Sequence, residues 1–147
     1  NSSNQLISPT HFKEFALPYH KTALKRFREL GYITTFVHLC GEHNKNLPHW
    51  AEIDFGDPAI ISVGHEVDLE TAAEYFPDDI IYGNLEPVYL QTAMPQEVYD
   101  ETRRILQKGK RIEGGFIFAT GCDIPPFTPV ENVKMMNKAV DDYGWYD

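Results

Sequence analysis

The stretch Ala59-Ile-Ile-Ser-Val63 gives the clearest indication of the fold. It is a short, almost continuous run of apolar residues, the pattern of a strand that is buried on both faces of a parallel sheet. Parallel strands are joined by crossover connections that are usually helical, so this run predicts helices on either side of it.

Three other β-branched or aromatic runs predict strands on similar grounds. They are Tyr32-Ile-Thr-Thr-Phe-Val-His38, Asp79-Ile-Ile-Tyr82 and Gly115-Phe-Ile-Phe-Ala119. Apolar spacing and end signals predict helices over residues 8–30, around 47–53, and over 68–76, 95–109 and 128–140. Successive strands start about 20 to 35 residues apart, as expected of βα units. The order fits a small open parallel sheet or half of a (β/α)8 barrel, which normally needs about 250 residues.

Three local signals refine the predicted helices. Pro18 lies inside the first helix and should kink or split it. Asp68 is predicted to cap the helix that follows the second strand. Thr128-Pro-Val-Glu131 has the pattern of a capping box with proline at the first helical position, so it predicts the start of the last helix.

The composition is that of one globular domain over residues 1–147, with 42% apolar and 24% charged residues. A net charge of −9 argues against a nucleic-acid partner, which needs a basic surface. The sequence has no apolar run of about 18 residues and no start typical of a signal peptide, so we expect neither a membrane span nor a leader. Two cysteines cannot build a disulfide framework and predict reduced thiols in a cytoplasmic protein.

Both cysteines follow predicted strands, which is where parallel α/β folds place their sites. The first strand ends in His38-Leu39-Cys40-Gly41, and alternation directs His38 and Cys40 to the same side. The fourth strand ends in Gly121-Cys122-Asp123. Two thiolates and one imidazole are the three protein ligands that a catalytic zinc ion needs beside one open position. The alternative is two inert buried cysteines near a strand-end histidine.

Other strand-end residues are weaker candidates for chemistry. Asn84 and Glu86, in the predicted loop Gly83-Asn84-Leu85-Glu86-Pro87, can reach a substrate, although a turn explains the same residues. His65 and Glu66 follow the second strand and are candidate ligands or members of a solvated loop. The strand-end loops hold no arginine and only Lys45, so nothing there clamps a phosphorylated or multiply carboxylated substrate.

Taken together, these motifs resemble the uroporphyrinogen decarboxylase superfamily over nearly the whole chain. The matching segments, in order, are Ile7-Ser-Pro9 with Phe12, Phe15 and Pro18-Tyr19, then His38-x-Cys40-Gly41, Gly83-Asn84-Leu85-Glu86-Pro87, Gly121-Cys122-Asp123-Ile124-Pro125-Pro126 and Thr128-Pro129-x-Glu131-Asn132. The resemblance implies an α/β fold, the C-terminal half of a (β/α)8 TIM barrel, with strands five to eight and their helices.

The resemblance also distinguishes two branches of the superfamily. True decarboxylases typically carry Gly-His-Gly-Ile where this chain has Gly121-Cys122-Asp123-Ile124. The cobalamin-dependent methyltransferases carry His-x-Cys and a later Gly-Cys as zinc ligands, the pattern of His38, Cys40 and Cys122 here. The chain departs from the family at Gly64, where an acidic residue is usual, and at Glu86, where aspartate is usual.

The methyltransferase branch implies methyl transfer between a corrinoid, carried on a partner protein, and a small-molecule acceptor such as tetrahydrofolate or a thiol. In this interpretation zinc is the metal, and Asn84 and Glu86 are candidate catalytic residues. The alternatives are a uroporphyrinogen decarboxylase, which works without a metal, and an inactive half-barrel or binding module. A half-barrel leaves strand edges and an apolar face open, so we expect it to pack against the missing N-terminal half or against itself.

Overall fold

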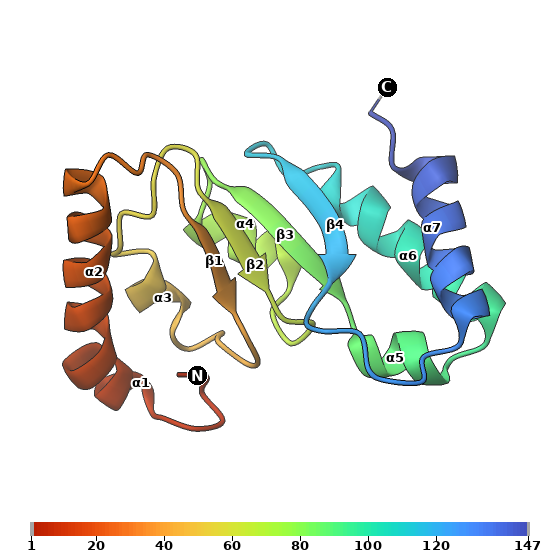
Figure 1. Ribbon diagram of the computed structural model, residues 1–147, viewed down its shortest axis with the longest axis horizontal. Coiled ribbons are helices and arrows are strands. Elements are labelled where there is room, and N and C mark those ends of the chain that lie inside the picture. Colours follow the sequence, from red (N-terminus) through yellow and green to blue (C-terminus); the bar gives the residue numbers. More distant parts are fainter. Residues whose placement is uncertain (1, 147) are drawn as a thin grey trace.

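The computed structural model describes residues 2–146 and contains one four-stranded parallel sheet. Its strands, in sheet order, are β1 (Phe36–Leu39), β2 (Ile60–Val63), β3 (Ile80–Leu85) and β4 (Phe116–Thr120). Because sheet order equals chain order, each crossover joins neighbouring strands, as in a (β/α)8 barrel. The predicted α/β architecture and all four predicted strands are confirmed, although β1 starts four residues later than predicted (Figure 1).

Helices alternate with these strands along the chain. They are α1 (Pro9–His11), α2 (Leu17–Glu29), α3 (Leu47–Trp50), α4 (Leu69–Tyr75), α5 (Pro87–Thr92), α6 (Pro95–Gly109) and α7 (Val130–Tyr143), with a π-helical segment, η1 (Phe12–Ala16), between α1 and α2. Figure 1 shows α4 and α6 behind the sheet. None of the helices in the described part of the chain is long and apolar enough to cross a membrane.

The N-terminal helix is split at the proline, as predicted. The Leu17 N–H donates to the Phe12 carbonyl, five residues earlier, and this bond closes the π-helical turn immediately before Pro18. Pro18 has no N–H and occupies the first turn of α2, where that N–H would have no helical partner. The break at Pro18 therefore costs little free energy. At the start of α1, the Ser8 hydroxyl caps the helix by accepting a hydrogen bond from the His11 N–H at 3.2 Å.

One face of the sheet is buried beneath the helices and the other is open. Leu39, Ile61 and Ile81 point to the helical side and are no more than 1% exposed. On the opposite face Phe36 is 54% exposed and Ile117 is 39% exposed. The apolar strands therefore bury only one face fully within this chain, and the other retains apolar surface that a further layer can cover.

We expect this chain on its own to self-associate through that open face. Phe36 and Ile117 offer apolar area, and the outer edges of β1 and β4 present unpaired backbone groups. Sedimentation at micromolar concentration should therefore show species larger than a monomer. A monodisperse monomer that binds no apolar dye would contradict this prediction.

The predicted loop at Gly83-Asn84-Leu85 is wrong, because these residues form the last part of β3. They pair with Phe118, Ala119 and Thr120 of β4. The ladder with β4 overrides the turn propensity of glycine and asparagine. Gly83 is required here: its φ is 142°, and a Cβ at this position would lie 2.9 Å from the Val63 carbonyl oxygen of β2.

Of the two predicted caps, one is confirmed and one is wrong. Asp68 accepts hydrogen bonds from the N–H groups of Glu70 at 3.0 Å and Thr71 at 3.2 Å, and thereby caps α4. Helix α7 instead starts at Val130 with Pro129 as its N-cap and no side-chain cap. The Thr128 hydroxyl donates backward to the Pro125 carbonyl at 2.8 Å, so it stabilises the preceding turn.

Candidate metal centre

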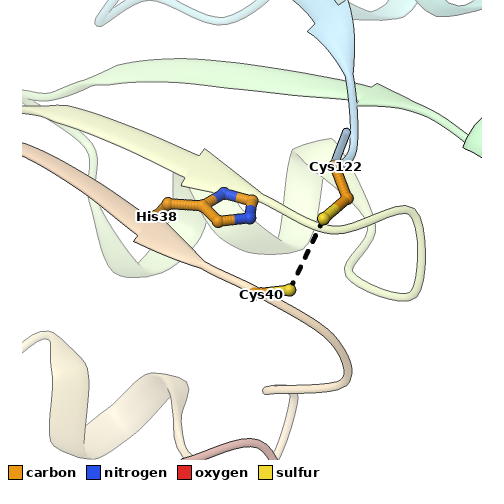
Figure 2. A group of neighbouring side chains, drawn as sticks. All are labelled: His38, Cys40 and Cys122. Carbon is orange, nitrogen blue, oxygen red and sulfur yellow. Dashed lines mark hydrogen bonds between the residues drawn. The ribbon is translucent and has the colours of Figure 1, made fainter. Parts of the chain in front are cut away.

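Three side chains from the carboxyl ends of the two outer strands meet at one point. His38 belongs to β1, Cys40 follows β1 directly, and Cys122 lies two residues beyond β4. Their ligand atoms all lie within 4.8 Å of one another, although 82 residues separate the cysteines (Figure 2). The carboxyl ends of the strands of a (β/α)8 barrel meet at one mouth, so the predicted convergence of these three residues is what the structure shows.

The spacing of the two sulfur atoms fits a tetrahedral zinc ion. The Cys40 and Cys122 Sγ atoms are 3.6 Å apart. With Zn–S bonds of about 2.3 Å, two sulfurs on a tetrahedron would be about 3.8 Å apart. Two soft sulfur donors and one imidazole nitrogen also form a donor set that zinc prefers over calcium or magnesium. The residues present therefore fit zinc.

The electrostatics around the cysteines favour a bound cation. Burial raises the pKa of the Cys40 thiol, and the Cys122 thiol and the carboxylates of Glu66 and Asp123 raise it further. A negative charge on the Cys40 sulfur is therefore unfavourable unless a cation compensates it. A cavity of about 500 Å³ opens beside the cluster, and no lysine or arginine is among the described residues that line it.

A buried histidine supports the backbone of the first cysteine. The Trp50 indole N–H donates to His43 Nδ1 at 3.0 Å, so the proton of a neutral His43 ring is on Nε2. Burial lowers the pKa of His43, and a hydrogen bond to the Cys40 backbone only partly offsets this. A neutral His43 thus links the loop after β1 to Trp50 and restrains the carbonyl of Cys40. The sequence pattern did not single out His43.

Asn84 and Glu86 lie in a neighbouring cavity, not in the one beside the cysteines. The Asn84 amide donates to the carbonyls of Gly64 at 3.2 Å and Val67 at 2.7 Å, and so holds the loop after β2. The Glu86 carboxylate is 3.7 Å from His65 Nε2. These contacts describe how the two residues are held, and their catalytic role stays a prediction.

The closeness of the two sulfurs predicts an oxidative cross-link in metal-free protein. Hydrogen peroxide should oxidise Cys40 and Cys122 to an intrachain disulfide, with loss of two hydrogen atoms and formation of two water molecules per peroxide. Intact mass and alkylation of the remaining thiols would measure the reaction. Saturation with zinc should slow the oxidation, because both cysteine sulfurs would then be bound to the metal ion and less able to attack peroxide. Two thiols that stay alkylatable after peroxide treatment would contradict the observed geometry.

The sequence is similar to known proteins over nearly its whole length. The uroporphyrinogen decarboxylase (URO-D) family matches residues 1–143. The chain is 32% identical over 145 residues to the methylcobamide:CoM methyltransferase MtbA of Methanosarcina mazei, covering 98% of this chain and 40% of that protein. It is 29% identical over 147 residues to the methylcobamide:CoM methyltransferase MtaA of Methanosarcina barkeri, covering 97% of this chain and 39% of that protein.

A uroporphyrinogen decarboxylase is also similar, over a shorter region. The enzyme of Rickettsia massiliae is 40% identical over 86 residues, which cover 57% of this chain and 23% of that protein. The chain thus spans about two fifths of the length of the methyltransferases that it matches. Its four parallel βα units are the architecture of part of the barrel of this family. On the family match and this fold, the chain belongs to the uroporphyrinogen decarboxylase family.

Proposed function

We propose that this chain is the metal-binding part of a corrinoid-dependent methyltransferase that holds zinc through His38, Cys40 and Cys122. The observation that carries the proposal is the cluster itself, in which the two sulfurs are 3.6 Å apart and all three ligand atoms lie within 4.8 Å of one another. The similarity to methylcobamide:CoM methyltransferases over 97–98% of the chain supports it.

The side chains around the cluster define how an acceptor would be received. Three protein ligands leave one tetrahedral position, and the cavity of about 500 Å³ lies beside them. When bound there, zinc would lower the pKa of an acceptor thiol and so favour its nucleophilic thiolate form at neutral pH. Phe36 and Tyr82 line the same cavity with their rings 5.2 Å apart, and they would shield the reacting group from water.

The open ligand position of the proposed zinc site favours a thiol as the acceptor over tetrahydrofolate. A thiol can occupy the open ligand position directly, whereas a folate ring offers no comparable soft donor. The names of the relatives also specify coenzyme M, a thiol. The corrinoid, carried on a separate protein, would supply the organometallic chemistry, while this chain and the rest of the barrel would position the acceptor.

The remainder of the barrel is a second expected partner. This chain covers 40% of the Methanosarcina mazei methyltransferase, so that relative is about two and a half times as long as this chain. In the proposed assembly the rest of such a protein covers the open face that carries Phe36 and Ile117 and closes the cavity.

The test is carried out on the full-length protein. Elemental analysis should find about one zinc ion per chain, and methylcobalamin should transfer its methyl group to a small thiol. A metal-free protein that decarboxylates a porphyrinogen would replace this proposal with the decarboxylase alternative. A protein that binds zinc but shows neither activity would favour the inactive module.

A further inference from the structure

Ser62 is the one polar side chain of strand β2, and its hydroxyl contacts the candidate ligand His38. The register of the sheet pairs Ser62 with His38 directly. The Ser62 Oγ lies 2.8 Å from His38 Nδ1, and Ser62 is only 2% exposed. A buried hydroxyl costs free energy unless it is hydrogen-bonded, so this contact accounts for a polar residue in an otherwise apolar strand.

The contact occupies Nδ1 of His38, so Nε2 is the nitrogen that a metal ion can approach. A neutral imidazole carries one N–H donor and one acceptor nitrogen. In the tautomer in which Nδ1–H donates to Ser62 Oγ, the lone pair is on Nε2 and is available to a metal ion. Figure 2 shows the His38 ring with the nitrogen farther from its Cβ turned toward the gap between Cys40 and Cys122.

We propose that Ser62 is a positioning residue, which orients the His38 ring and accepts its Nδ1–H when Nε2 binds a metal ion. This proposal rests on the proposed zinc site. Residues that form a hydrogen bond with a histidine ligand, without contacting the metal themselves, set both the basicity and the orientation of that ligand. His38 itself lies on the open, exposed face of β1, where little packing restrains its ring. The hydroxyl on the adjacent strand therefore provides the restraint that packing does not.

A matched pair of substitutions in the full-length protein separates the hydroxyl from the volume of the side chain. Ser62→Thr keeps a hydroxyl, whereas Ser62→Val has nearly the same shape without it, and both are β-branched residues that suit a strand. Metal affinity is measured by competition for Zn²⁺ with a chromophoric chelator. The absorption spectrum of the Co²⁺-substituted protein then reports the ligand geometry.

We expect Ser62→Val to bind zinc about 10- to 100-fold more weakly than the parent, with an altered cobalt spectrum. Ser62→Thr should stay within a few-fold of the parent and keep its spectrum. If the added volume of valine prevents folding, Ser62→Ala removes the hydroxyl without adding volume and should show the same loss. Equal affinities for the threonine and valine variants would overturn the role of Ser62. A parent protein that binds no zinc would instead overturn the proposed function.

Discussion

Cys122→Ser in the full-length protein is expected to abolish stoichiometric zinc binding, from about one ion per chain to nearly none. The substitution removes one of the three proposed protein ligands and replaces a thiolate with a hydroxyl that stays protonated and is a poor zinc ligand. Methyl transfer from methylcobalamin to a thiol should fall together with the metal content. Elemental analysis and the transfer assay on the same preparation measure both effects.

The fold should survive this change, which makes the loss interpretable. Cys122 is exposed and lies two residues beyond the end of β4, so its side chain contributes little to the core. Phe127→Ala is a suitable control on the same segment, since Phe127 is 96% exposed and lines neither cavity at the strand ends. The control should retain its zinc. Undiminished zinc in Cys122→Ser would remove this residue from the proposed ligands.

Features encoded by contiguous residues were predicted well from the sequence. Helix α6 has the bounds that Pro95 and Gly109 predict, because proline at the first turn and an amphipathic repeat are local signals. The convergence of Cys40 and Cys122 followed from the barrel topology, in which the carboxyl ends of parallel strands meet at one mouth. No knowledge of the register was needed, because both cysteines lie at strand ends.

Features that depend on register were missed. The residues Gly83–Leu85 have turn composition but pair with β4, and α5 begins only two residues after that longer strand ends. Ser62 was visible as the one polar residue in an apolar run, but its role depends on the pairing of β2 with His38. Cross-strand and cross-loop partners are set by tertiary packing, so a single sequence shows that such a residue is unusual without showing what it contacts.

The start of α7 is a further place where a local sequence signal and a tertiary contact lead to different expectations. The pattern at Thr128 favours a cap, yet Thr128 bonds to the preceding turn. The anchor of α7 is Asn132, which is 1% exposed and whose amide donates to the carbonyls of Leu90 at 2.8 Å and Ala93 at 2.9 Å. These carbonyls lie at the C-terminal end of α5, where backbone acceptors have no partner within the helix. Asn132 thus joins α7 to α5.

Asn132→Ala should therefore lower the free energy of unfolding by about 2–4 kcal/mol, since one buried and one half-buried carbonyl each lose a bond worth about 1–2 kcal/mol. Asn132→Asp keeps the shape but has no donor, and its carboxylate would face two carbonyl oxygens, so it should be at least as destabilising. Thr128→Ala should cost no more than about 1 kcal/mol, because it removes one bond at a half-buried turn. Urea denaturation of the three variants measures the differences. A Thr128→Ala cost clearly larger than that of Asn132→Ala would show that the sequence-based capping box, and not the Asn132 bridge, holds the helix.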